Sequence, residues 1–346
     1  MPTPTTPLKL RGAPGSPYTR KMCAALRYRH IPYRLIIQGT REDRDLPEPK
    51  VRLLPTFFLP GEDGGEIAVV DSTPLIRRFE REFSGRSIVP ADPVVAFLDL
   101  LLEDYADEWL TKAMFHYRWA YAADVAKAAA VLPRWSRIDA PEERVAALSK
   151  MIAERQVDRL WVVGSNATTG PVIEASYRRF LKLFDAHLTE HPFLMGRRPG
   201  ASDFGAYGQL TQLACFDPTP AAVTLQEAPR VYAWVMVMDD LSGLQPGNAD
   251  WIARDAVPQT LRALLSEVGR VYAPFLLANA QALASGAERV ECTIDGQPWV
   301  QQPFPYQGKC LLWLRQAHAA LGDADRAAVD RVLAGTGCDA LFMEAS

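Results

Sequence analysis

A carboxylate and a hydroxyl stand side by side where a helix is expected to begin. Asp71 and Ser72 follow a short apolar run and precede Thr73-Pro74, and a proline near the first helical position is typical of a helix start. The first N–H groups of a helix have no partner within it, so they favour an anionic ligand. The pair therefore predicts a site for a charged group, although capping of the helix by either side chain would explain the same residues.

A second hydroxyl stands in a similar position near the start of the chain. Ser16 is followed by Pro17 after a Gly- and Pro-rich loop, and this order also favours a helix start. Between the two helix starts, Pro55 comes directly before residues 56–59, which read as a strand. Proline is poorly tolerated there unless it lies at an edge or in a special turn. These positions point to chemistry as well as to architecture.

The elements that must position these residues form a small α/β domain. Apolar and β-branched runs predict strands at residues 8–10, 33–37, 56–59 and 67–70, with helices over residues 18–29 and from residue 71. The stretch from Gly61 to Gly65 is the turn between the last two strands. Because a helical crossover makes the first two strands parallel, we expect a small mixed sheet with helices packed against it.

After residue 84 the pattern becomes helical. Residues 84–93 are rich in Gly, Pro and Ser and predict a linker. Apolar spacing then predicts helices over residues 94–129, 141–160, 172–187, 203–215 and 229–241.

A third stretch follows residue 241. It is expected to contain a helical segment over residues 258–284, a β-hairpin that turns at Asp295-Gly296, and helices over residues 307–321 and 324–333. The predicted division of the chain is therefore residues 1–84, 93–241 and 242–346.

Composition narrows the class of protein. The chain has 346 residues, 48% of them hydrophobic, and a net charge of −3, which indicates a globular protein and argues against a nucleic-acid partner. No apolar run approaches the roughly 20 residues needed to cross a bilayer, and the first seven residues lack the features of a signal peptide. Five widely spaced cysteines without a CxxC pair predict reduced thiols and a cytoplasmic location. No metal site is expected, because His187 and His191 lack the glutamate of an HExxH motif and read as a solvated helix end.

With these motifs in this order, the stretch from about Leu8 to Leu241 resembles the glutathione transferase superfamily. Ser16-Pro17-Tyr18 stands where that family has its catalytic residue, and Leu54-Pro55 is similar to the family's Val-Pro pair, whose proline is cis. Asp71-Ser72 resembles the pair that holds the γ-glutamyl group. The resemblance implies a thioredoxin-like N-terminal domain and an all-helical second domain. Residues 242–346 match nothing specific in the family and are a C-terminal extension.

The resemblance also implies glutathione as co-substrate. The backbone at Leu54-Pro55 would pair with the cysteinyl part, Ser72 would hold the glutamyl carboxylate, and Asp71 would face the glutamyl ammonium. The hydroxyl of Ser16 would donate to the sulfur and stabilise the thiolate, since a free thiol has a pKa of roughly 8.5. Capping alone remains an alternative role for Ser16, and the nearby hydroxyls of Tyr18 and Thr19 are the fallback donors. In the second domain, Asp203 resembles the acidic residue of a capping box and is expected to be structural.

The implied reaction is conjugation of glutathione to a small apolar electrophile, as in detoxification, by a cytoplasmic homodimer without a nucleic-acid or membrane partner. We expect some of Trp109, Phe115 and Trp119 to face the electrophile. One alternative is a glutathione-dependent oxidoreductase or peroxidase, although Cys23 is interpreted as a core residue. A non-catalytic binding protein is another, because Leu53 stands where the family has a Lys or Gln for the glycyl carboxylate. Lys50, Arg52 or Arg41 would have to replace that residue.

Overall fold

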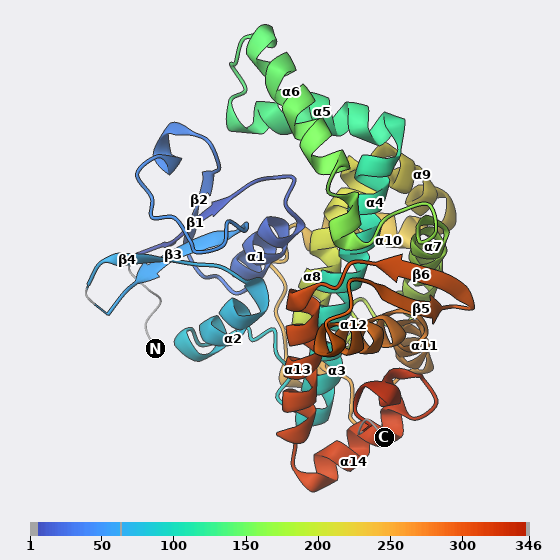
Figure 1. Ribbon diagram of the computed structural model, residues 1–346. Coiled ribbons are helices and arrows are strands. Elements are labelled where there is room, and N and C mark those ends of the chain that lie inside the picture. The colour runs from blue at the N-terminus through green and yellow to red at the C-terminus, as the bar shows by residue number, and fades with distance from the viewer. Residues whose placement is uncertain (1–5, 63, 344–346) are drawn as a thin grey trace.

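The N-terminal region of the computed structural model is a four-stranded mixed sheet with two helices (Figure 1). The structure describes residues 6–62 and 64–343, so most of the first seven residues, which were considered as a signal peptide, lie outside it. Strands β1 (Leu8–Gly12), β2 (Tyr33–Ile37), β3 (Thr56–Pro60) and β4 (Glu66–Val69) lie in the order β2-β1-β3-β4. Strand β1 is parallel to β2 and antiparallel to β3. This thioredoxin-like arrangement confirms the predicted α/β fold class.

Helices α1 (Pro17–Tyr28) and α2 (Ser72–Glu82) pack on this sheet through apolar side chains. The central strand β3 carries Phe57, which is fully buried and contacts Phe79 of α2 with ring centroids 5.2 Å apart. Helix α1 begins where Ser16 and Pro17 predict, because the Ser16 hydroxyl accepts a hydrogen bond from the backbone N–H of Thr19.

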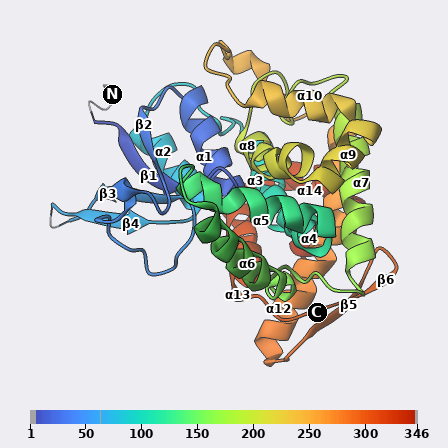
Figure 2. The same cartoon turned by 90° about the horizontal axis from the view of Figure 1, so that it is seen from above.

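A helical region follows the linker, as the sequence predicts. Figures 1 and 2 show its helices stacked beside the sheet, with α5 and α6 extending away from the rest of the helical region. The helices are α3 (Pro93–Tyr105), α4 (Thr111–Ala120), α5 (Ala122–Ser136), α6 (Glu142–Val157), α7 (Gly170–His187), α8 (Ala201–Leu210), α9 (Pro218–Glu227) and α10 (Pro229–Met238). Single π-helical segments, Ala106–Leu110 (η2) and Thr211–Phe216 (η4), continue α3 and α8.

Two features of this region differ from the prediction. The helix expected over residues 94–129 is interrupted at Tyr121, whose backbone is extended between α4 and α5. The Tyr121 hydroxyl donates to Glu174 at 2.6 Å and its ring stacks on Tyr117, and these contacts accompany the bend. Helix α9 was not predicted, although Pro218 and Pro220 lie in its first turn, where missing N–H groups cost nothing.

The last hundred residues add helices and a hairpin to the same body. Helices α11 (Gln259–Glu267) and α12 (Ala273–Ser285) are joined by the π-helical segment Val268–Tyr272 (η6). Strands β5 (Val290–Ile294) and β6 (Gln297–Gln301) form the predicted hairpin, with Asp295 and Gly296 at positive φ in the turn. Helices α13 (Pro305–Ala319) and α14 (Asp323–Leu333) complete the extension, and both contact α3.

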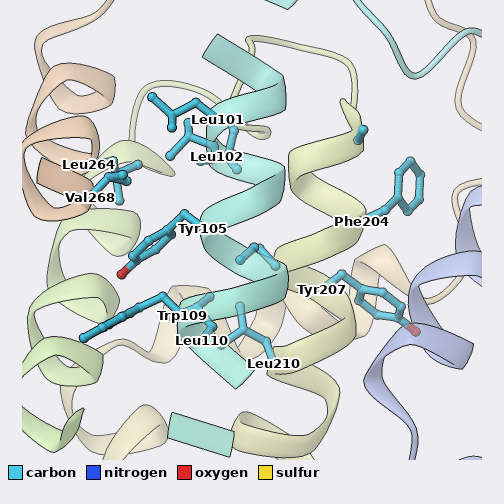
Figure 3. Close-up of a cluster of buried hydrophobic side chains, with 14 of the residues drawn as sticks. Leu101, Leu102, Tyr105, Trp109, Leu110, Phe204, Tyr207, Leu210, Leu264 and Val268 are labelled. Atoms are coloured by element: carbon cyan, nitrogen blue, oxygen red, sulfur yellow. The ribbon is translucent and has the colours of Figure 1, made fainter. Parts of the chain in front are cut away.

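The extension shares one hydrophobic core with the helical region. Figure 3 shows Tyr105 and Trp109 on the face of α3 and η2 that meets Leu264 and Val268 of the extension, while Phe204 and Tyr207 of α8 point towards α1. This corrects the expectation for Trp109, which is 1% exposed and lies 5.3 Å from the ring of Trp299. The extension covers Trp109, so this side chain cannot line an open substrate site.

The interpretation of His187 as part of a solvated helix end is wrong. His187 is fully buried, its Nδ1 lies 3.0 Å from the Thr260 hydroxyl, and its Nε2 lies 3.1 Å from the Phe193 carbonyl. Burial lowers the pKa of His187 to about 4, so it is a neutral core residue. Among the described residues, no group of His, Cys, Asp and Glu side chains could hold a metal, and no helix is long and apolar enough to cross a membrane.

Candidate functional site

The hydroxyl of Ser16 lies at the N-terminus of α1, beside the loop that precedes β3. Its Oγ lies 3.4 Å from the carbonyl oxygen of Leu54, and the Leu54–Pro55 peptide bond is cis, as the resemblance implies. A hydroxyl at a helix N-terminus lies in the positive electrostatic potential of the unpaired N–H groups. The structure therefore brings Ser16 and the Leu54-Pro55 backbone to one place, although they are 38 residues apart.

The loop before Ser16 is held by the helical region. Arg118 of α4 donates to the carbonyl of Gly15 at 3.1 Å, and Gln212 of η4 donates to the carbonyl of Pro14 at 3.2 Å. Arg118 is itself fixed by a buried ion pair of 2.9 Å with Asp217. Three polar side chains outside the sheet domain thus fix the backbone that presents the Ser16 hydroxyl.

The predicted pair Asp71-Ser72 lies at the start of α2, as expected, but Asp71 does not cap the helix. Its side chain makes no capping hydrogen bond, and its backbone has a φ of 86°. A non-glycine residue in this region is strained, and such strain is concentrated at functional sites. Ser72 is 7% exposed, and its hydroxyl accepts from the ammonium of Lys21 at 3.3 Å.

Lys21 joins the two helix starts to the helical region. It is fully buried, and its ammonium lies 2.8 Å from Glu103 Oε1 and 2.5 Å from Asp107 Oδ2. Burial acts to lower the pKa of Lys21, but the carboxylates of Asp107 and Glu103 outweigh it and the pKa is raised. The Lys21 ammonium, on a side chain of α1, therefore stays charged next to the N-terminus of α2.

The C-terminal extension also reaches this site. Tyr306, near the start of α13, donates its hydroxyl to Oδ2 of Asp71 at 2.8 Å. Burial raises the pKa of Asp71, and the hydrogen bond from Tyr306 opposes that increase. Seven residues further along α13, the ring of Trp313 meets the ring of Tyr306 edge-on, with the ring centroids 6.0 Å apart. The carboxylate that the resemblance assigns to an ammonium is thus already engaged by a side chain of the same chain.

Carboxylates dominate the electrostatics where α13 meets α3 and η2. Burial, reinforced by neighbouring carboxylates, raises the pKa of Glu108 to about 8 and that of Asp104 to about 7. Glu108 accepts from Gln307 at 3.0 Å, and Asp104 accepts from the Tyr272 hydroxyl at 2.7 Å. Both partners belong to the extension, so these acids lie in the contact between the extension and the helical region. At neutral pH Glu108 is largely protonated and Asp104 is about half protonated.

Tyr18 lies in the same interface but is engaged elsewhere. Its hydroxyl donates to the carbonyl of Asp107 at 2.7 Å and lies 2.9 Å from the hydroxyl of Thr111. Burial and the nearby carboxylates of Glu108 and Asp107 raise its pKa well above the usual value. Of the two predicted hydroxyls, Ser16 is the one that adjoins the Leu54-Pro55 backbone.

The basic residues considered for the glycyl carboxylate lie on an exposed loop. Leu53 is 47% exposed, and Arg52 makes an ion pair of 3.3 Å with Glu48. Lys50 and Arg41 are exposed as well. An exposed and solvated cation offers less binding energy than a buried one, so this end of the site is the weakest.

Sequence reasoning missed Lys21, Arg118 and Tyr306. A signal for Lys21 was present, because Glu103 and Asp107 are spaced i, i+4 in an otherwise apolar helix and need a buried cation. For Tyr306 there was none, because its partner lies 235 residues away.

Comparison with known proteins gives one match to a family model. Residues 10–87 match the model described as "Glutathione S-transferase, N-terminal domain". Comparison with curated proteins gives no match.

Solved structures of similar fold are all distant in sequence. A glutathione transferase from Burkholderia graminis, with two glutathione molecules bound per subunit, is 16% identical over 69% of this chain and 90% of its own, with a TM-score of 0.42. A Tau class glutathione S-transferase from mango, Mangifera indica, is 17% identical over 74% of this chain and 95% of its own, with a TM-score of 0.41. A glutathione transferase family member from Pseudomonas fluorescens Pf-5, with two glutathione bound, is 14% identical over 67% and 92%, with a TM-score of 0.40.

The family assignment rests on the sequence match, which covers every predicted site residue from Ser16 to Ser72. Residues 10–87 are therefore similar in sequence to the glutathione S-transferase N-terminal domain.

Proposed function

We propose that the protein is a glutathione transferase that conjugates glutathione to a small apolar electrophile. The observation that carries this proposal is the 3.4 Å approach of the Ser16 hydroxyl to the Leu54 carbonyl. A thiol group delivered along the Leu54-Pro55 backbone would reach both this hydroxyl and the N-terminus of α1. The match of residues 10–87 to the family model supports the same site.

The proposed chemistry needs a thiolate. Ser16 would turn its hydroxyl from Leu54 to the sulfur, and its hydrogen bond together with the helix N-terminus would lower the thiol pKa. The thiol proton leaves to solvent, the sulfur electron pair forms an S–C bond with the electrophilic carbon, and the leaving group departs with its bonding pair. Orientation of the two reactants supplies much of the remaining rate.

The amino-acid end of glutathione would occupy the start of α2. Its carboxylate would accept from the first N–H groups of α2 and from Ser72, near the ammonium of Lys21. Its ammonium would lie against Asp71, in the place where the Tyr306 hydroxyl now donates. We therefore propose that Tyr306 forms one wall of this subsite. Ser16, rather than Tyr18, is the proposed thiolate donor, because the Tyr18 hydroxyl already donates to Asp107.

Replacing Ser16 with Ala tests the proposal. A hydrogen bond to a charged group is worth about 1.5–3 kcal/mol, so turnover with a halogenated aromatic should fall about 10- to 100-fold. Calorimetric titration should show glutathione binding within about threefold of the wild-type affinity, since Ser16 does not hold the peptide backbone. Ser149→Ala on α6, far along the chain from the site, is the matched control and should leave both values unchanged.

The proposal fails if wild-type protein binds no glutathione at millimolar concentration, or if Ser16→Ala turns over at the wild-type rate.

A non-catalytic binding protein is the second candidate. The hydrogen bond from Tyr306 to Asp71 favours it, because the extension already satisfies the carboxylate that should receive the glutamyl ammonium. Such a protein would bind glutathione or a related peptide without any turnover for Ser16→Ala to remove.

The cysteines argue against the oxidoreductase alternative. Cys23 is 5% exposed and burial raises its pKa to about 11, which is consistent with a core residue. Cys310 of α13 approaches Asp104, but burial and the neighbouring carboxylates raise its pKa strongly, so it is a poor nucleophile. A turnover assay with a disulfide substrate distinguishes this alternative, and we expect no activity in it.

The homodimer, the cytoplasmic location and the role in detoxification also remain proposals. Five free cysteines in the described chain support a reducing compartment. Light scattering would test the oligomeric state, and a strictly monomeric mass would contradict the dimer.

A further inference from the structure

A pocket of about 650 Å³ lies at the opposite end of α1 from Ser16. Its lining comes from the residues just after α1, from the linker, from the loop before α8 and from the loop that follows α10. It includes His30, Arg86, Arg198, Gln245 and Trp251. Helix α1 has 12 residues and is therefore about 18 Å long. The pocket is thus separate from the proposed thiol site and does not rest on the proposed function.

Arg198 is a buried cation in this pocket. It is 4% exposed, and its guanidinium lies over the ring of Trp251 at 4.4 Å. It donates to the carbonyls of Gly247 at 3.1 Å and Ser87 at 2.6 Å. Within the described chain its Nε has no hydrogen-bond partner. The hydroxyl of Tyr28, which interacts with Arg198, also has no geometrically good partner within the described chain. A buried N–H group on a charged side chain costs free energy when it is unpaired, so an acceptor on a ligand would stabilise Arg198.

Arg86 is a second arginine of the pocket lining whose guanidinium lies over an aromatic ring. Its guanidinium lies over the ring of Tyr28 at 4.4 Å and donates to three carbonyls, those of Tyr28, Leu241 and Leu244. Burial lowers the pKa of Arg86, Tyr28 opposes this decrease, and the charge of Arg198 adds a smaller decrease.

Within the described residues, no carboxylate forms an ion pair with Arg86 or Arg198. Neither Arg86 nor Arg198 has an acidic partner within 4.0 Å among residues 6–62 and 64–343. The one carboxylate of the lining, Glu80, is engaged by Arg29 at 3.1 Å and by the hydroxyl of Ser87 at 2.6 Å. His30 also lines the pocket, with its Nε2 2.8 Å from the carbonyl of Ser242.

The backbone of the pocket is strained at two of its lining residues. His30 has a φ of 54° and Arg86 a φ of 46°, both in the left-handed region that non-glycine residues seldom adopt. Backbone strain of this kind persists only where the surrounding structure holds the residue in place, and it is concentrated at functional sites.

We propose that this pocket binds a small molecule with a compact dianionic group, a phosphate ester or a pair of carboxylates. The two guanidinium groups supply planar N–H donors suited to such an anion, and Trp251 and Val89 add apolar surface for the rest of the ligand. Its volume matches that of a site for a metabolite-sized ligand. Since the lining comes from the sheet domain, the linker and the helical region, the bound anion would bridge them.

Calorimetric titration of the full-length protein with inorganic phosphate and, separately, with malonate tests this site. We expect phosphate to bind with a Kd below about 1 mM. Heat from phosphate alone supports a phosphate ester, and heat from both anions supports a general dianion site. No heat from either anion at 10 mM overturns the proposal.

Two variants place the binding at this pocket. Gln245→Glu adds a negative charge at an exposed lining residue that holds no side-chain hydrogen bond in the described structure, so the fold should be kept and affinity should fall about fivefold or more. Arg198→Met keeps an apolar contact with Trp251 but removes the guanidinium, and it should abolish binding. Gln281→Glu on the exposed side of α12 is the matched control and should bind like the wild type. Equal affinity in Gln245→Glu and the wild type would overturn the assignment.

Discussion

Tyr306 illustrates how one side chain of the extension completes a site in the sheet domain. Its hydroxyl supplies a neutral donor to the half-buried carboxylate of Asp71, which the charge of Lys21 and the backbone of Thr73 also stabilise. A hydrogen bond to a charged group contributes more than one between neutral groups. The contact therefore stabilises both the extension and the strained backbone at Asp71.

Replacing Tyr306 with Phe should lower the free energy of unfolding by about 1–3 kcal/mol, because Asp71 loses its donor while the ring is retained. Denaturant unfolding followed by circular dichroism measures this change. Tyr232→Phe on α10 is the control, since its half-buried hydroxyl makes no hydrogen bond in the described structure, and it should change the value by less than about 0.5 kcal/mol. Equal stability of the two variants would refute the structural role of the Tyr306 hydroxyl.

Lys21 is a buried cation whose loss would leave the buried carboxylate of Asp107 without a cationic partner, while Glu103 would keep its ion pair of 3.1 Å with Arg77. Lys21→Met keeps the length of the side chain but removes the charge between Glu103 and Asp107, so we expect a loss of about 3–5 kcal/mol. The same unfolding measurement tests this expectation. Lys150→Met, at an exposed ion pair of 3.9 Å on α6, should cost less than about 1 kcal/mol. A similar small cost at Lys21 would contradict the buried-pair interpretation.

At the scale of elements, α1 depends on close contact with α8. A Cβ atom added at Gly208 would lie 2.5 Å from the carbonyl oxygen of Pro17, which is backbone and cannot move freely. Helix α1 would have to shift at the turn that carries Ser16. The packing of α8 and the presentation of the proposed catalytic hydroxyl are therefore linked.

Gly208→Ala should lower stability by about 1–3 kcal/mol and reduce turnover, because it displaces the start of α1. Thermal unfolding and the conjugation assay measure the two effects. Gly243→Ala is the matched control, since a Cβ at that position meets nothing within 4 Å. If Gly208→Ala melts and turns over like Gly243→Ala, the helix contact is not as tight as described.

Several elements could be predicted from the sequence because their signals are local. Ser16-Pro17, Asp295-Gly296 and the strand before Pro60 are each defined by a few consecutive residues. The bend at Tyr121 and the short helix after Asp217 could not be read in the same way. Both depend on contacts with distant residues, such as Glu174 and Arg118, that periodicity does not reveal.

At the scale of the molecule, the predicted division at residues 84, 93 and 241 stays a prediction, whereas the packing of the extension is a finding. Leu264, Val268 and Trp299 belong to the same core as α3. The sequence showed an apolar third segment but not what it covers, because burial against a particular helix leaves no mark on spacing. For this reason the sequence did not reveal that the extension buries Trp109.

Protonated acids between the extension and α3 predict a pH-dependent stability. The folded state raises the pKa of Glu108 to about 8, so the native protein keeps a proton that the unfolded chain releases above its ordinary pKa of roughly 4.3. Its contribution is fully present below that value and is lost as pH rises towards 8. Glu108→Gln cannot ionise, so relative to the variant the wild type should lose stability between pH 5 and pH 8.

Denaturant unfolding at the two pH values measures this difference. Asp104, whose pKa is raised to about 7, lies near Glu108 and will add a smaller pH dependence to both proteins. Glu143→Gln on the exposed face of α6 should differ from the wild type by the same amount at both pH values. A constant difference for Glu108→Gln as well would show that Glu108 is ionised in the native protein.

The bond between Tyr306 and Asp71 also bears on how the protein is made. A ribosome adds roughly 5–20 residues per second, so the 235 positions between the two residues correspond to roughly 12–47 s of synthesis. Throughout that interval the nascent sheet domain exposes its carboxylate to water. The sheet domain thus acquires this contact only after α13 has been synthesised.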